Sequence, residues 1–107
     1  MELTNNKKPT SLKELQEYFK AKAVERGFDK ETPQDAMLLM TEEMGELARA
    51  IRKHAGIKTD DKERIYAMEE ELADMQIYLL HLANLLGLDL EESFWKKEAE
   101  NETRKWE

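Results

Sequence analysis

Acidic side chains lie on the apolar face of a predicted helix in the segment 39–50, LMTEEMGELARA. At about 100° per residue, Met40 and Leu47 mark the centre of that face, and Glu43 falls inside its arc. Glu46 lies at the edge of the same arc. A carboxylate on the buried side of a helix is costly unless it is paired or bound to a metal. The fold of this chain must therefore supply a partner for these acids.

A second segment, 69–80, repeats this arrangement in the sequence EEELADMQIYLL. Glu71 borders its apolar stripe, and Asp74 lies three residues later on the same side. When two such helices pack, their four carboxylates can converge. Each like-charge pair about 5 Å apart would then cost about 3 kcal/mol at an effective dielectric constant of about 20. That repulsion is large beside a domain stability of about 5–15 kcal/mol, and bound cations would remove it.

The predicted metal site consists of four carboxylates, those of Glu43, Glu46, Glu71 and Asp74. Such hard oxygen donors favour Mg²⁺ or Mn²⁺ over iron or zinc. Mg²⁺ bound by a few carboxylates keeps positions for water and substrate phosphates, so phosphoryl or nucleotidyl chemistry is the natural use of the site. Two alternatives stay open, namely a solvated acidic surface and pairing with basic residues such as Arg49.

Capping signals divide the chain into four expected helices. Ser11 with Glu14 three residues later forms a capping box, and Asp89 with Glu92 forms another. Thr32 followed by proline begins a helix in the preferred manner. Glycines follow the ends of the first three helices, where a left-handed residue is favoured. The expected helices cover about residues 12–26, 33–54, 61–86 and 90 onward.

The fold class that follows is all-α, a four-helix bundle-like arrangement without strands. The chain has 107 residues, so we expect one domain over residues 1–107, with residues 1–10 as a flexible N-terminal segment. The second half of the third helix, MQIYLLHLANLL, is apolar on nearly every side, which favours completion of the bundle by a homodimer or homotetramer. Within it, His81 is expected to be a hydrogen-bonded core residue rather than a metal ligand.

Charge and composition exclude several classes of partner. The formal net charge of −7 argues against nucleic acid and against an anionic membrane surface. The chain has no cysteine, so disulfides, thiol chemistry and zinc–thiolate sites are excluded. No apolar run approaches about 18 residues and no leader pattern is present, so we expect neither a membrane span nor a signal peptide, and a cytoplasmic location.

The expected fourth helix carries a polar and basic stripe. Lys97, Asn101 and Arg104 fall at i, i+4 and i+7, which places them on one side of a helix that continues through residue 104. One interpretation of this stripe is a solvated basic face that pairs with the neighbouring glutamates.

The two acidic segments together resemble a known signature. Glu42-Glu43-Met44-Gly45-Glu46 followed by Glu71-Leu72-Ala73-Asp74 is similar to the EExxE…ExxD pattern of MazG-like nucleoside triphosphate pyrophosphohydrolases, members of the all-α NTP pyrophosphatase superfamily. The resemblance covers about residues 12–106 and includes the basic tail.

This resemblance implies roles for particular residues. The four acids of the predicted metal site would bind Mg²⁺, with Mn²⁺ as a substitute, and Glu42 would support them. Lys97, Asn101 and Arg104 would hold the triphosphate. Tyr78 matches a position that meets the nucleotide in some members of the family. The resemblance does not transfer a base or sugar preference.

Two functional hypotheses from different classes follow. In the first, the protein is a Mg²⁺-dependent hydrolase that cleaves a nucleoside triphosphate between the α and β phosphates, giving the monophosphate and pyrophosphate, for example in nucleotide-pool housecleaning. The catalytic acids would be Glu42, Glu43 and Glu46, with Glu42 or Glu46 steering or deprotonating the attacking water. In the second, the chain is a non-catalytic helical homo-oligomeric interaction module.

Overall fold

The computed structural model describes residues 8–56 and 61–104. This part of the chain is all-α and contains no strand, which confirms the predicted fold class. Residues 1–7 of the predicted flexible segment lie outside the described residues, and residues 8–10 are described without helical structure. The four helices are α1 (Leu12–Arg26), α2 (Pro33–Gly56), α3 (Asp61–Leu86) and α4 (Leu90–Asn101).

The helix ends follow their capping residues. Ser11 and Glu14 form the predicted reciprocal capping box, and Gly27 ends α1 with a left-handed φ of 79°. At the start of α2, Thr32 Oγ1 accepts from the Asp35 N–H at 3.1 Å, and the Asp35 carboxylate accepts from the Thr32 N–H at 3.3 Å. These bonds satisfy N–H groups that the first helical turn leaves unpaired.

The predicted capping box at the start of α4 is only half present. The Asp89 carboxylate accepts from the Glu92 N–H at 2.9 Å, as predicted. The Glu92 carboxylate lies instead 3.4 Å from the ammonium of Lys96, one turn further along the helix. Lys96, at i+4, offers the Glu92 side chain a partner other than the backbone. The predicted return bond, from the Asp89 N–H to the Glu92 carboxylate, is absent, so this half of the prediction is wrong.

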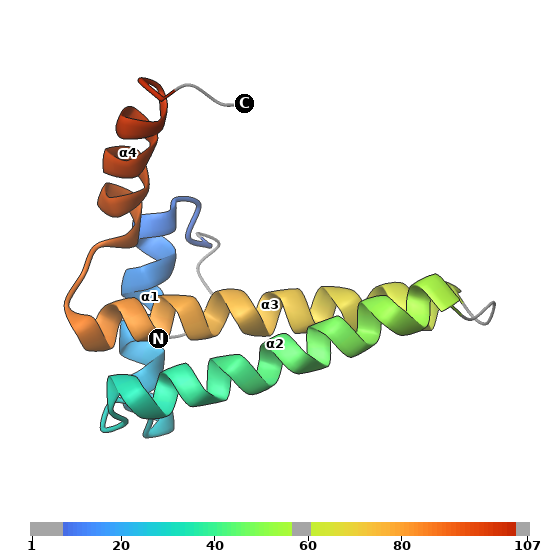
Figure 1. Ribbon diagram of the computed structural model, residues 1–107. Coiled ribbons are helices and arrows are strands. Elements are labelled where there is room, and N and C mark those ends of the chain that lie inside the picture. Colours follow the sequence, from blue (N-terminus) through green and yellow to red (C-terminus); the bar gives the residue numbers. More distant parts are fainter. Residues whose placement is uncertain (1–7, 57–60, 105–107) are drawn as a thin grey trace.

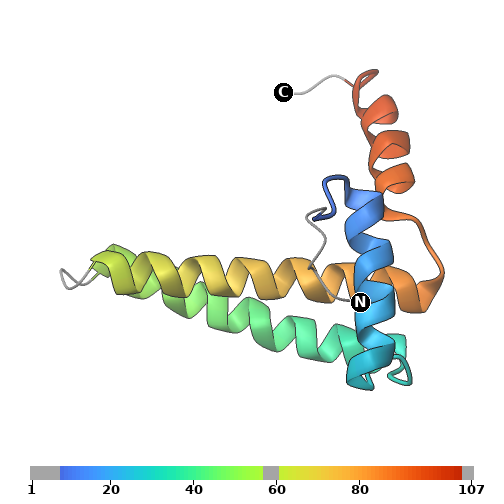
Figure 2. The same cartoon turned by 180° about the vertical axis from the view of Figure 1, so that it is seen from behind.

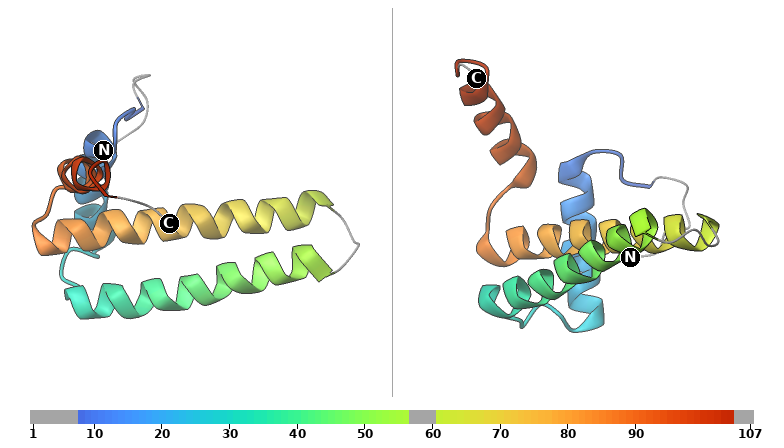
Figure 3. Two further views of the ribbon diagram at one scale, coloured as in Figure 1. Left: turned by 45° about the horizontal axis from the view of Figure 1, so that its top comes forward. Right: turned by 45° about the vertical axis from the view of Figure 1, so that its right-hand side comes forward.

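Helices α2 and α3 form a long antiparallel hairpin, and α1 crosses α3 near the end of the hairpin where the chain links α1 to α2 (Figure 1). The reverse view shows α4 leading away from the hairpin beyond the N-terminal end of α1 (Figure 2). In the further views, α4 lies on the opposite side of α3 from α2 (Figure 3). The molecule is consequently extended, with dimensions of 44 × 42 × 33 Å.

The buried core lies where α1 crosses α3. Phe19, Ala23 and Leu80 form its centre, and Leu12, Leu15 and Leu90 pack partly buried against it. Elsewhere large apolar side chains remain exposed, including Ile51 at 51%, Leu72 at 58% and Leu79 at 44%. The sequence predicted a buried face at these positions, and one chain alone does not bury it. Within the described ranges, no helix is long and apolar enough to cross a membrane.

A cluster of side-chain hydrogen bonds joins α4 to the core. The amide of Gln16 donates to Asn84 Oδ1 at 2.9 Å and to the Leu88 carbonyl at 2.7 Å. Its carbonyl oxygen accepts from the Leu90 N–H at 2.9 Å. Asn84 Nδ2 donates in return to the Gln16 backbone carbonyl at 3.1 Å. Gln16 therefore binds the end of α3, the following turn and the start of α4 at once.

Candidate functional site

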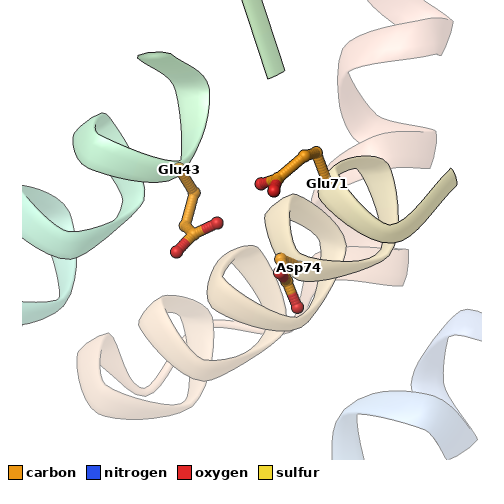
Figure 4. A group of neighbouring side chains, drawn as sticks. All are labelled: Glu43, Glu71 and Asp74. Atoms are coloured by element: carbon orange, nitrogen blue, oxygen red, sulfur yellow. The ribbon is translucent and has the colours of Figure 1, made fainter. Parts of the chain in front are cut away.

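Three acidic side chains meet between the two helices of the hairpin. Glu43 extends from α2 toward Glu71 and Asp74 of α3, as Figure 4 shows. Each residue offers a carboxylate oxygen, and these oxygens lie within 4.8 Å of one another. Because Glu71 and Asp74 are three residues apart, one face of α3 presents both to α2. The arrangement gathers negative charge from two helices into one small volume.

The raised pKa of Glu43 shows that burial and the neighbouring negative charges disfavour its ionised form. The pKa of Glu43 is raised to about 7, first by burial and then by a hydrogen bond with Glu71 and by the charges of Glu71, Asp74 and Glu46. In addition, Oε2 of Glu71 is buried and, among the described residues, has no hydrogen-bond partner. Buried polar atoms are normally satisfied, so the Glu71 oxygen marks a place for a missing partner.

The chemistry of the donors fits a divalent cation. A cluster made only of carboxylate oxygens suits the hard ions Mg²⁺ and Mn²⁺ better than zinc or iron. Placing such an ion among the oxygens of Glu43, Glu71 and Asp74 would remove the repulsion that favours a protonated Glu43. Three carboxylates do not fill an octahedral shell, and the remaining positions are open to water and phosphate oxygens.

The structure does not bring Glu46, the fourth acid of the predicted site, into this cluster. Its side chain is 49% exposed and lies 3.6 Å from the guanidinium of Arg49, the pairing that the sequence had left open as an alternative. Glu42 is also exposed. The charges of Glu42 and Glu43 nevertheless reach Tyr78, whose pKa is raised by burial first and by the surrounding carboxylates second.

The predicted phosphate-binding stripe is divided by the end of α4. Lys97 and Asn101 lie within the helix, which ends at Asn101. The backbone then turns, with the Arg104 N–H donating to the Asn101 carbonyl at 3.1 Å, so a continuous helical stripe through Arg104 is wrong. Thr103 reinforces the turn because its hydroxyl donates to the Glu100 carbonyl at 2.8 Å.

The remaining residues of that stripe lie away from the acids. Lys97 is 59% exposed and lies 3.5 Å from Glu100 on its own helix. Asn101 has a buried Oδ1 without a hydrogen-bond partner among the described residues. Both side chains line a groove with Leu79 and Leu80 of α3, and α4 lies on the opposite side of α3 from α2, the helix that carries Glu43 (Figure 3).

Next to the acidic cluster lies a cavity of about 220 Å³ that the sequence did not predict. Asp74 contributes to its wall, as do the rings of Phe19, Phe28 and Tyr78. Further polar side chains in the same wall are those of Arg26, Glu31 and His81. The cavity thus joins an aromatic wall to a proposed metal ligand.

His81 is buried and hydrogen-bonded, as the sequence predicted, but its partner was missed. Its Nε2 lies 2.8 Å from Oε1 of Glu31, which belongs to the connection between α1 and α2. The spacing of Asp74, Tyr78 and His81 at i, i+4 and i+7 was a usable signal, since it places all three on one stripe of α3. Nothing comparable indicated Glu31, because helical periodicity does not extend into a connection.

Two comparisons with known proteins gave matches. The family model of the MazG nucleotide pyrophosphohydrolase domain matches residues 31–105. The Bacillus subtilis (strain 168) protein called "Uncharacterized protein YpjD" is 42% identical over 67 residues, which cover 58% of this chain. The match spans 57% of the length of that relative. The acidic cluster and Glu31 both fall within the range of the family match.

Proposed function

This chain belongs to the MazG nucleotide pyrophosphohydrolase domain family, and from that premise we propose that it is a Mg²⁺-dependent nucleoside triphosphate pyrophosphohydrolase. The single observation that carries the proposal is the meeting of three carboxylates from two helices within 4.8 Å. The proposed reaction is hydrolysis between the α and β phosphates. Water attacks the α phosphorus, the bond from that phosphorus to the bridging oxygen breaks, and the products are the monophosphate and pyrophosphate.

Within this reaction, Glu43, Glu71 and Asp74 hold the divalent ion. When bound, Mg²⁺ supplies Lewis-acid polarisation of the phosphate oxygens and neutralises charge on the leaving pyrophosphate. An exposed carboxylate next to the cluster, Glu42 or Glu46, orients the attacking water and accepts its proton. The charge of Glu46 is felt at Glu43, which supports its place at the margin of the site.

The proposal assigns the triphosphate to Lys97, Asn101 and Arg104, and it assigns these residues to a second copy of the chain. Two observations support this arrangement. The first is the position of α4 on the opposite side of α3 from α2, the helix that carries Glu43 (Figure 3). The second is the exposed apolar surface of α2 and α3, which a homodimer or homotetramer would cover. In a site shared between copies, the acids of one chain would lie beside the predicted triphosphate ligands of another chain.

The test is pyrophosphate release from a panel of common and oxidised nucleoside triphosphates, with Mg²⁺, with Mn²⁺ and with a chelator. We expect metal-dependent turnover of at least one triphosphate. Glu43→Gln should abolish turnover, whereas Glu70→Gln, which makes the same change at an exposed position beside Glu71, should retain it. A Glu43→Gln enzyme with full turnover would overturn the proposed role.

The alternative function is a non-catalytic module that assembles through its helices. The exposed apolar side chains of α2 and α3 favour assembly but do not distinguish a module from an enzyme. The two functions differ in what the acidic cluster does. A protein that assembles, hydrolyses no triphosphate in the panel and shows no response to divalent ions would be the module.

A further inference from the structure

The cavity between the α1–α2 connection and α3 has the features of a recognition pocket for a planar ring. Phe19, Phe28 and Tyr78 contribute aromatic surface to a volume of about 220 Å³. Sites for whole drug-sized ligands measure about 300–1,000 Å³, so this volume suits one part of a larger ligand. Asp74 lies in the wall, and a ring in the cavity would therefore be adjacent to a proposed metal ligand.

The polar edge of this pocket is a carboxylate held in place by a histidine. The His81 side chain is 4% exposed, and its Nε2 lies 2.8 Å from Glu31 Oε1, whose side chain is 28% exposed. Nδ1 of His81 is buried without a hydrogen-bond partner among the described residues. A carboxylate accepts hydrogen bonds, so His81 donates from Nε2 to Glu31.

Two edge-to-face contacts fix that histidine in turn. The ring of Phe19 lies 5.7 Å from the His81 ring at 75°, and the ring of Phe28 lies 6.4 Å away at 64°. Glu31 belongs to the connection between α1 and α2, but its hydrogen bond to His81 attaches it to helix α3. A carboxylate accepts more than one hydrogen bond, so Glu31 keeps acceptor capacity toward the cavity after its bond to His81.

From this geometry we infer that the cavity binds the base of the substrate and that Glu31 is a specificity-determining residue for guanine. The inference rests on the proposed function, because the base must be attached to a triphosphate that reaches the acidic cluster. Guanine presents two adjacent donors, the ring N1–H and the exocyclic amino group, and a carboxylate accepts both. Arg26, which also lines the cavity, brings donors suited to the guanine carbonyl oxygen.

The other bases match this polar edge less well. Uracil presents a single N–H between two carbonyl oxygens, which a carboxylate repels. Adenine and cytosine present an amino group beside a ring nitrogen that is itself an acceptor. Hypoxanthine keeps the N1–H of guanine and lacks only the amino group. The pair GTP and ITP therefore isolates one of the two hydrogen bonds that the inference assigns to Glu31.

The experiment measures kcat/KM for pyrophosphate release from GTP, ITP and UTP, together with the Kd of each in the presence of Mg²⁺. The full-length wild type should prefer GTP to ITP and to UTP by about tenfold or more, because hydrogen bonds to a charged group discriminate by about this factor. Glu31→Gln should reduce both ratios by about tenfold. Asp29→Asn, in the same connection but outside the cavity wall, should leave both ratios unchanged.

Each outcome bears on the inference. A wild type that binds and hydrolyses GTP, ITP and UTP equally well, or a Glu31→Gln variant with unchanged ratios, would overturn it while the proposed hydrolase activity stands. If no triphosphate is hydrolysed, the proposed function fails, and the Kd ratios alone decide the inference. If Glu31→Gln fails to fold, the wild-type comparison of GTP with ITP decides it without any substitution.

Discussion

At the scale of single residues, Glu43 departs from the rule that carboxylates are kept out of a folded interior unless they are paired. Its pKa is raised to about 7 because burial and neighbouring carboxylates both disfavour its charged form. In the folded protein Glu43 therefore binds a proton that the unfolded chain releases at lower pH. A group of this kind destabilises the metal-free fold when it is ionised.

This shift gives a prediction for pH dependence. Between the ordinary pKa of 4.5 and about 7, the folded state binds more protons than the unfolded state at this position, so its contribution to stability falls as pH rises. In chelator, the melting temperature of the wild type should fall across this window more than that of Glu43→Gln. Thermal melts at pH 5, 6, 7 and 8 measure the difference. Parallel curves for the two proteins would contradict the prediction.

Residue spacing predicted only part of the site. Helical periodicity identified three acids because each lies on or beside an apolar stripe, namely Glu43, Glu71 and Asp74. Packing of the helices does not change which residues share a face. Glu46 lies at the edge of the apolar arc of α2. A small rotation of α2 at this position decides whether the side chain points to the cluster or to solvent, and Arg49 offers it a partner on the solvent side. Glu31 could not be predicted, since its bond to His81 joins positions 50 residues apart.

At the scale of helices, the local signals were sufficient for most boundaries. Ser11, Thr32 and Asp89 cap their helices as predicted, and Gly27 and Gly87 have positive φ values of 79° and 70°. Two ends differ from the prediction: α2 includes Gly56, which was expected to follow its end, and α4 ends at Asn101, where no glycine or proline signals a stop. A predicted stripe was extended through Arg104 because periodicity alone does not indicate where a helix ends.

The position of α4 depends on Gln16, which gives a second prediction. Gln16→Ala removes bonds to Asn84, the Leu88 carbonyl and the Leu90 N–H, so unfolding free energy should fall by about 1–3 kcal/mol. Urea denaturation measures this loss. Gln34→Ala, at an exposed position in the first turn of α2, is the matched control and should change stability by less than about 0.5 kcal/mol. Equal effects of the two substitutions would refute a special role for Gln16.

At the scale of the whole molecule, the described part of one chain keeps the two halves of the predicted site apart. Glu43 lies on α2, and Glu71 and Asp74 lie on the face of α3 toward it, whereas α4, which carries Lys97 and Asn101, lies on the other side of α3 (Figure 3). An apolar groove of about 400 Å³ runs between α1, α3 and α4, lined by side chains that include Leu79 and Phe94. The sequence predicted the helices and the need for a partner. It could not predict how α4 leaves the hairpin, because that geometry depends on long-range contacts.

A site shared between copies predicts rescue by mixing. Glu43→Gln and Lys97→Ala should each be inactive alone, since each removes one half of every site. When they are unfolded together and refolded as a mixture, about a quarter of the sites should carry both intact halves if each site uses two chains of a symmetric pair. Pyrophosphate release should recover to about that fraction. A mixture that stays inactive, although subunits exchange, would indicate that each chain holds a complete site.

The central claim is that Glu43, Glu71 and Asp74 bind a divalent ion, and the most direct measurement is thermal melting with and without Mg²⁺ or Mn²⁺. An ion that binds only the folded state stabilises it by about 2.7 kcal/mol at a concentration of 100 times Kd. We predict a clear rise in the melting temperature of the wild type and of Glu70→Gln, and little or none in Glu43→Gln or Glu71→Gln. A wild type that responds to neither ion, or a Glu43→Gln variant that responds as fully as the wild type, would contradict the claim.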